Sequence, residues 1–362
     1  MIPIFDAHLD LAWSAVFFNR DLSAPLSDVR AHERAMTDEP GRGRGTVTLP
    51  ELRRAGVGVC VATLLARGGP EQKLQPGYKR SDLDYVNQDV AHCAAHAQLA
   101  WYRLMEQRGQ LRMLRTGPEL AAHWERWRQS PDTTLLGVIL SMEGADPVVT
   151  TDQLDDWHAL GLRAIGPAHY GRGHYAYGTA TDGPLGTRGV ELLRRMDQLG
   201  FLLDVTHLSD ASMAEALEVF SGPVLASHHN CRVLVPGDRQ LTDGQVRRLV
   251  SRDAVIGVAL DAWMLHPGWE RGRTSPQVVG LEACADHIDH VCQLAGTTRH
   301  SGIGSDLDGG FGTEQTPHDL DTIADLQKLA GILDRRGYKR ADVEAIFHGN
   351  FLRLFTQALP HE

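Results

Sequence analysis

Paired cysteines, long apolar runs and an excess of positive charge are all missing from this 362-residue chain. Its five cysteines are scattered and form no CxxC arrangement, which argues against a disulfide framework or a thiolate metal site. No apolar run approaches the roughly 20 residues needed to cross a bilayer, and no signal peptide is recognisable before the first strand-like residues. The formal charge of −10 argues against nucleic acid and anionic membranes as partners. We therefore expect a cytoplasmic protein.

What the sequence does contain is an alternation of short apolar runs with amphipathic stretches. Eight runs resemble buried strands: the opening residues from Ile2, then 57–66, 135–142, 162–169, 201–207, 222–229, 254–260 and 301–310. Helical patterns lie between them, such as 190–200, which ends in a glycine, and 210–220, which follows the N-cap candidate Ser209. This alternation predicts an α/β fold, a (β/α)8 TIM-type barrel. No repeat or linker marks a second domain, so we expect one domain over 1–362.

The spacing between the predicted strands is uneven near the start of the chain. The first two intervals are much longer than a helical crossover needs, and the excess lies in 19–45 and 81–130. We interpret 19–45 as a loop or lid inserted after the first strand, and 81–130 as extra helices after the second.

Side chains that bind metals or move protons stand at the ends of six of these runs. They are His8 with Asp10, Glu143, His169, His207, His228 and Asp306. Within a strand, side chains two residues apart share a face, so His8 and Asp10 can converge. The carboxyl ends of barrel strands open on one face, where such folds place their active sites. A single histidine in this position is usually structural, and a His8–Asp10 hydrogen bond needs no metal, but six strands ending in this way predict a site.

A mixture of imidazole and carboxylate groups suits Zn²⁺ or a similar ion. The number of groups indicates a two-metal centre, with Glu143 the best bridge because its strand lies between the two histidine groups. Two ions about 3.5–4 Å apart lower the pKa of a shared water. Asp306 can then take a proton from this water and pass it to a leaving amine, although it can also serve as an extra ligand.

The motifs that carry these residues resemble those of one known family. They are "HLD" (8–10), "SMEGADP" (141–147), "DVTHLS" (204–209), "ASHHN" (226–230), "ADHIDHV" (285–291) and "GIGSDLDGG" (302–310). In this order they resemble the membrane (renal) dipeptidases, a zinc metallopeptidase family of the amidohydrolase barrels. The similarity extends to "LLRRMDQLGFLLDVTHLS" (192–209) and "GNFLRLF" (349–355), and so spans nearly the whole chain.

The resemblance implies a role for each residue of the set. His8 and Asp10 would hold one Zn²⁺, His207 and His228 the other, and Glu143 would bridge both. Asp306 would be the catalytic acid and base, and His169 would hydrogen-bond the scissile carbonyl. Arg239, in "GDRQLTD", would bind the terminal carboxylate of the substrate. Without the resemblance, a surface ion pair is the simpler interpretation of Arg239.

The implied function is a dinuclear zinc dipeptidase in which a metal-bridging hydroxide attacks dipeptides, L-Xaa-D-Xaa dipeptides among them. The family also tends to form dimers, which makes a homodimer possible. Two other functions stay open: a metal-dependent amidohydrolase acting on another small amide or lactone, and a catalytically idle barrel that binds peptides or metals. The segment "YGRGHYAYGTATDG" (170–183) and Leu307 depart from the family pattern, so the substrate side chains are not determined.

Overall fold

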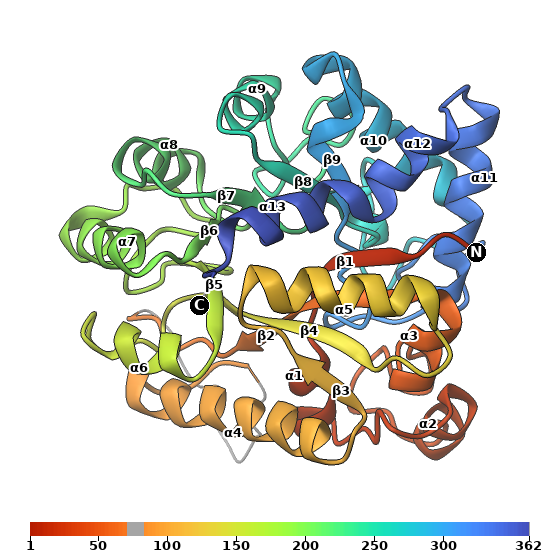
Figure 1. Ribbon diagram of the computed structural model, residues 1–362, viewed down its shortest axis with the longest axis horizontal. Helices are drawn as coiled ribbons and strands as arrows, with labels where there is room; N and C mark the ends of the chain where they lie inside the picture. The colour runs from red at the N-terminus through yellow and green to blue at the C-terminus, as the bar shows by residue number, and fades with distance from the viewer. Residues whose placement is uncertain (71–82, 362) are drawn as a thin grey trace.

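The computed structural model describes residues 1–70 and 83–361, and its centre is a closed barrel of parallel strands surrounded by helices (Figure 1). The barrel strands are β1 (Ile4–Leu9), β2 (Val57–Leu65), β4 (Leu136–Glu143), β5 (Leu162–Gly166), β6 (Leu202–Asp204), β7 (Val224–Ala226), β8 (Val255–Val258) and β9 (Ser301–Ile303). Each strand pairs with its neighbours in parallel, and the pairing of β2 with β4 closes the ring. The predicted TIM-type barrel is confirmed.

A further strand, β3 (Leu111–Met113), was not predicted from the sequence. It pairs with the start of β4 at 136–138, on the edge that β5 occupies from Leu140 onward, and so lies outside the ring. A strand of three residues with an exposed arginine at its centre leaves too little pattern to detect.

The helices cover the outside of the barrel and its lower end. They are α1 (Leu11–Phe17), α2 (Leu26–Glu33), α3 (Leu49–Ala55), α4 (Gln88–Gln107), α5 (Gly117–Gln129), α6 (Gln153–Ala159), α7 (Gly186–Leu199), α8 (Asp210–Val219), α9 (Asp243–Ser251), α10 (Leu281–Ala295), α11 (Gln327–Arg335), α12 (Arg340–Glu344) and α13 (Asn350–Ala358). Two predicted helix ends are confirmed: α7 stops at the left-handed Gly200, and the Ser209 side chain caps α8 by accepting from the Ser212 amide.

The two inserted segments differ in part from their prediction. The 19–45 segment is not simply a loop, because it contains α2. Glu33, the last residue of α2, forms a buried ion pair of 2.8 Å with Arg20. Beyond it, the Thr46 amide donates to Asp308, after β9, at 2.7 Å. In 81–130 the predicted extra helices are confirmed as α4 and α5, with β3 between them; residues 81–82 lie outside the described chain.

Apolar side chains fill the half of the barrel interior nearest the amino-terminal ends of the strands, called the lower half below. Phe5 of β1 stacks on Phe351 and Phe355 of α13, with ring centroids 5.9 and 5.4 Å apart. Helix α13 lies beside α5 across this end of the strands (Figure 1). Because apolar side chains close this end, the polar groups that can contact a ligand lie at the opposite end, where the strands finish.

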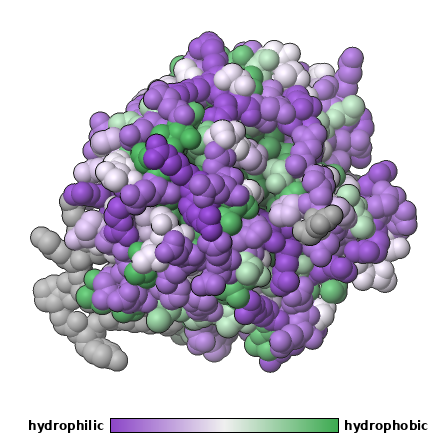
Figure 2. Space-filling view, turned by 60° about the vertical axis from the view of Figure 1, so that its left-hand side comes forward, coloured by the Kyte–Doolittle hydropathy of each residue, from purple (hydrophilic) through white to green (hydrophobic). Residues whose placement is uncertain are grey.

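No helix of the described chain is both long and apolar enough to cross a membrane. On the face drawn in Figure 2, hydrophilic residues cover most of the surface, and apolar residues form small groups between them. The five cysteines are free; Cys93 is exposed and the other four are buried.

We expect Phe351→Ala to destabilise the protein by about 3–5 kcal/mol, because it removes a fully buried ring from the closed end of the barrel. The free energy of unfolding in urea measures the loss. The control is Leu104→Ala, since Leu104 is 41% exposed. Equal stability of the two variants would contradict the packing described here.

Candidate metal centre and substrate cavity

The first two candidate ligands, His8 and Asp10, converge at the end of a strand. Strand β1 ends at Leu9, and Asp10 is the residue that precedes α1. The pairing of β1 with β2 is also irregular between Asp6 and Leu9. Such an irregularity re-aims side chains, and His8 lies 3.6 Å from Asp10 between Nε2 and Oδ2. The predicted contact is confirmed, and it forms at the end of the strand, because Asp10 lies one residue beyond β1.

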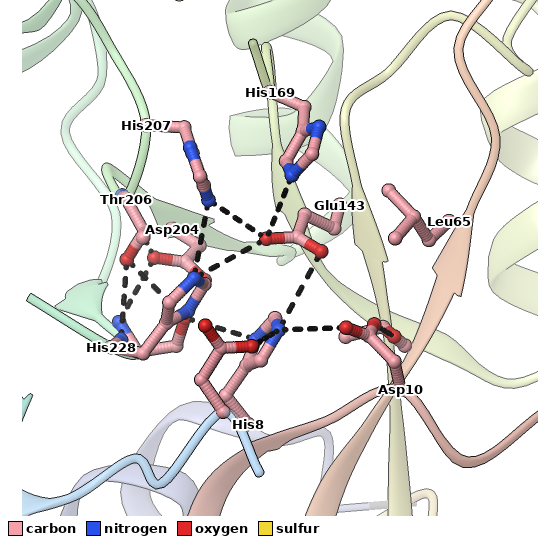
Figure 3. A network of polar contacts seen from close by, with 12 residues as sticks. His8, Asp10, Leu65, Glu143, His169, Asp204, Thr206, His207 and His228 are labelled. Atoms are coloured by element: carbon pink, nitrogen blue, oxygen red, sulfur yellow. Dashed lines mark hydrogen bonds and ion pairs between the residues drawn. The ribbon is translucent and has the colours of Figure 1, made fainter. Parts of the chain in front are cut away.

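Glu143, the last residue of β4, stands at the centre of the site (Figure 3). Its Oε1 lies 3.1 Å from His207 Nε2 and 3.4 Å from His228 Nε2. Its Oε2 lies 3.5 Å from His8 Nε2. One carboxylate oxygen therefore faces the His207 and His228 pair while the other faces His8, which is the arrangement expected of a bridging ligand.

Three overlapping groups in this cluster have ligand atoms close enough to hold a metal ion. They are His8, Asp10 and Glu143; Glu143, His207 and His228; and His8, His228 and Asp306. The first two groups are the predicted sets, and the third includes Asp306, whose Oδ1 lies 3.7 Å from His8 Nε2. The alternative in which Asp306 is a ligand thus stays open on geometry.

Neighbouring hydroxyl groups hold the ligands in place. Thr179 Oγ1 lies 3.0 Å from His207 Nδ1, and Ser227 Oγ lies 2.9 Å from His228 Nδ1. The Thr63 hydroxyl donates to Asp10 Oδ1. Each contact fixes the ring or carboxylate so that its other atom faces the centre. Sequence reasoning missed these three residues, because a serine or threonine carries no signal of which side chain it will meet.

Backbone geometry shapes the site as well. His207 and Asp306 have positive φ angles of 68° and 57°, a left-handed conformation that costs energy in residues other than glycine. Two residues before Asp306, a Cβ on Gly304 would lie 1.7 Å from the carbonyl oxygen of Ser227, so only glycine allows the segments that follow β9 and β7 to approach this closely. The fold thus accepts strain and close approach where the functional side chains meet.

The charges of the cluster fit a bound cation. Burial alone lowers the pKa of His8, but the carboxylates of Glu143 and Asp10 outweigh it and raise that pKa well above its ordinary value. The carboxylates therefore attract positive charge at the position His8 faces. His8 Nε2 is also fully buried with no hydrogen-bond partner in the described chain. A buried nitrogen that lies beside carboxylates and has no hydrogen-bond partner is suited to bind a metal ion.

The second pair of histidines is suited to ligation in a different way. Burial, together with neighbouring positive charge, lowers the pKa of His207 and of His228 well below its ordinary value. Both rings are thus neutral at physiological pH, as a metal ligand requires. The donor set of imidazoles and carboxylates, without thiolates, fits a divalent ion such as Zn²⁺.

A cavity of about 480 Å³ opens above the cluster. Residues from all eight barrel strands, or from the loops that follow them, line it. Arg239 is among them and is 1% exposed; its Nη2 donates to the carbonyl of His228 at 2.9 Å. Its Nη1 is buried and has no partner in the described chain. Arg239 is therefore not in a surface ion pair, and the N–H groups on Nη1 are left without a partner among the described residues.

His169 lies beside Glu143, with 3.9 Å between His169 Nε2 and Glu143 Oε1 (Figure 3). Burial, and then the positive charge of Arg67, lower the pKa of His169 well below its ordinary value, so the ring is neutral. Arg67 Nη1 lies 3.5 Å from His169 Nδ1. Because a guanidinium can only donate, this contact favours the tautomer with its hydrogen on Nε2, facing the cluster.

Two cavity residues missed by the sequence analysis could have been found by its own rule. Arg67 follows the predicted strand 57–66, and Asp261 directly follows 254–260. The sequence analysis assigns no functional residue to either of these two runs. Inspecting the residue after every predicted strand, rather than only histidines and clustered acids, would have included them.

Comparison with known proteins agrees with this geometry. The family described as membrane dipeptidase (peptidase family M19) matches residues 1–360. The chain belongs to the membrane dipeptidase family. The resemblance stated from the sequence motifs is thus confirmed, and with it the expectation of a metallopeptidase fold and a metal-dependent family.

Dipeptidases of other organisms match between 56% and 98% of the chain. Dipeptidase aclJ of Aspergillus oryzae is 25% identical over 98% of this chain and 77% of its own length. Dipeptidase tcpJ of Claviceps purpurea is 27% identical over 56% of this chain, a match that covers 46% of that protein, or about half its length. A metallopeptidase from Rhodobacter sphaeroides, solved with a phosphinate mimic of L-Ala-D-Ala, has the same fold: TM-score 0.77, 23% identity and 99% coverage of both chains.

We expect Thr179→Val to weaken Zn²⁺ binding about 10- to 100-fold, because it removes the hydroxyl that orients His207. Competition against a chelator with known zinc affinity measures the change. Thr181→Val is the matched control: Thr181 lies in the same loop, and its hydroxyl donates to the Gly178 carbonyl rather than to a ligand. If both variants bind zinc as the parent protein does, the hydroxyl has no role in holding the metal site.

Proposed function

We propose that this protein is a dinuclear zinc dipeptidase that hydrolyses dipeptides, including those of L-Xaa-D-Xaa configuration. The observation that carries the proposal is the position of Glu143, with one oxygen facing His207 and His228 and the other facing His8. Family membership supports it, as does the L-Ala-D-Ala mimic bound to the Rhodobacter sphaeroides metallopeptidase of the same fold.

We assign the ligands as the sequence analysis did. His8 and Asp10 would hold one ion, His207 and His228 the other, and Glu143 would bridge the two. Two bound ions lower the pKa of a shared water and stabilise negative charge developing on the carbonyl oxygen of the substrate. The protein's own residues supply the remaining chemistry.

His169 would donate a hydrogen bond to the carbonyl oxygen of the peptide bond. Its ring is neutral, the Arg67 contact favours the hydrogen on Nε2, and Nε2 faces the cluster. A donor placed in advance at this position stabilises the oxyanion that forms as the carbonyl is attacked.

Asp306 would move the proton. Burial raises the pKa of its carboxyl well above the ordinary value, with the nearby carboxylates of Asp10 and Glu143 adding to the shift. A carboxyl with a raised pKa can take a proton from the attacking water and give it to the departing amine nitrogen.

Arg239 would limit the substrate to two residues. Its buried Nη1 has no partner in the described chain, and its guanidinium suits a planar carboxylate. With the scissile bond at the cluster and the terminal carboxylate on Arg239, a longer C-terminal extension would place a neutral peptide group against a buried charge.

Asp306→Asn should lower kcat for L-Ala-D-Ala and L-Ala-L-Ala by about 100- to 10,000-fold while the metal content per chain is retained. Asparagine keeps the shape and accepts the left-handed backbone, but it cannot carry the proton. Asp253→Asn is a matched control, because Asp253 also has a positive φ, 52°, but lies outside the cavity. Full activity of Asp306→Asn, or no hydrolysis of any dipeptide by the zinc-loaded parent, would refute the proposal.

Arg239→Met should lower kcat/KM for dipeptides by about 100-fold or more, because the substrate carboxylate would lose a buried, charged partner. For dipeptide amides, which have no terminal carboxylate, the same variant should change kcat/KM far less. Arg247→Met, at an exposed position, is the control. Equal losses on both substrate classes would contradict carboxylate binding by Arg239, and no loss on either class would favour an amidohydrolase that does not recognise a carboxylate.

A further inference from the structure

Asp261 is an acidic side chain of the cavity that the proposed reaction does not use. It follows β8, lines the cavity and is 6% exposed. Both of its carboxylate oxygens accept from the side-chain amide of Gln315, at 2.9 and 3.0 Å. Oδ1 also accepts from the Trp263 amide at 3.3 Å. Its protein partners are therefore neutral, and the carboxylate is held in one position.

The negative charge of Asp261 is only weakly compensated among the described residues, by the positive charge of Arg271. Arg271, a cation of the same cavity, donates instead to the carbonyl of Gly310 at 2.6 Å. Among residues 1–70 and 83–361, Asp261 forms no ion pair within 4.0 Å. Burial raises the pKa of its carboxyl to about 7, against smaller lowering contributions from the hydrogen bonds of Gln315 and Trp263 and the charge of Arg271. A buried carboxylate without an ion pair, facing a substrate cavity, is a site for a cationic ligand group.

The position of Asp261 indicates which end of a dipeptide it meets. The segment after it is held against the chain that carries Arg239: Asn230 and Gln240 both donate from their side chains to the carbonyl of Met264, at 3.3 and 2.9 Å. Asp261 therefore lies on the Arg239 side of the cavity. Since Arg239 is assigned to the terminal carboxylate, the side chain closest to Asp261 belongs to the C-terminal residue.

The surroundings of Asp261 also suit a long side chain with a charge at its end. Trp263, Met264 and Trp269 line the same cavity and supply apolar surface. Methylene groups of lysine-like side chains pack on such surface while the charged end reaches a polar partner.

We propose that Asp261 makes the enzyme select dipeptides whose C-terminal residue has a cationic side chain of the lysine type. This inference rests on the proposed dipeptidase function. Gln315 acts as a positioning residue that holds the Asp261 carboxylate toward the cavity.

The test compares kcat/KM of the zinc-loaded enzyme for Ala-Lys, Ala-norleucine and Ala-Glu, each with an L- or a D-residue at the C-terminal position. Norleucine has the apolar stem without the charge. We expect Ala-Lys to exceed Ala-norleucine by about tenfold or more, and Ala-Glu to be the poorest of the three. In Asp261→Asn the ratio of Ala-Lys to Ala-norleucine should fall to about one. A ratio does not depend on the fraction of folded enzyme, and Asp261→Ser gives a second reading of it.

The control variant is Asp132→Asn, which makes the same change in net charge at an exposed position outside the cavity and should leave the ratio as in the parent. A parent ratio near one, or a ratio unchanged in Asp261→Asn, overturns the assignment of Asp261. A preference for Lys-Ala over norleucine-Ala, without one for Ala-Lys, overturns its C-terminal position. Hydrolysis of none of these dipeptides overturns the proposed function and this inference together, so the two failures are distinguishable.

Discussion

The attraction between a buried group of carboxylates and the positive charge they require is the constraint on which this structure depends. Asp10, Glu143 and Asp306 lie within a few ångströms of His8 at the mouth of the barrel, where the first two are buried and Asp306 is partly buried. Removing such charges from water is costly, and the cost is tolerable only when opposite charge lies close by. Within the protein alone, that positive charge is the proton which the carboxylates favour on His8. A divalent cation carries more positive charge than this proton and can bind several of these side chains at once.

The barrel makes this concentration of polar groups possible by separating its two ends. Its lower half is packed with apolar side chains and closed by the rings of Phe351 and Phe355, which stabilise the strands without any contribution from the site. The upper end can then hold features that destabilise a protein, such as the left-handed backbone at His207 and Asp306. Rigid strands aim these side chains at one point, as a reaction that needs ligands at fixed distances requires.

Above the cluster, two charged side chains of opposite sign define the substrate cavity. Arg239 has an unpartnered buried nitrogen, and Asp261 is hydrogen-bonded only to neutral protein groups in the described chain. Each is a charge that the folded protein leaves incompletely satisfied, and each lies on the same side of the cavity. Under the proposed function, the cluster hydrolyses the peptide bond, and Arg239 and Asp261 select the dipeptide whose peptide bond lies at the cluster.

Much of the fold and the site was determined by the sequence. The alternating apolar runs predicted the barrel because buried parallel strands are apolar on both faces, and a histidine or acid directly after such a run has only the open end of the barrel to face. Thus Glu143, His207, His228 and Asp306 were found from their place in the chain, and they do converge. The short, mixed pattern of β3 and the helix α2 within 19–45 gave too weak a signal against their surroundings.

Tertiary structure alone decided what the convergent groups contact. The irregular pairing of β1 with β2 near His8 could not be read from the sequence. The packing of distant segments places Thr179 beside His207 and leaves Arg239 Nη1 without a partner among the described residues. The physical reason is that a local pattern specifies which residues are buried and at which end of a strand, because burial and periodicity act along the chain. Hydrogen-bond partners, ring orientation and uncompensated charge depend on which distant segments pack together, and no local pattern carries that information.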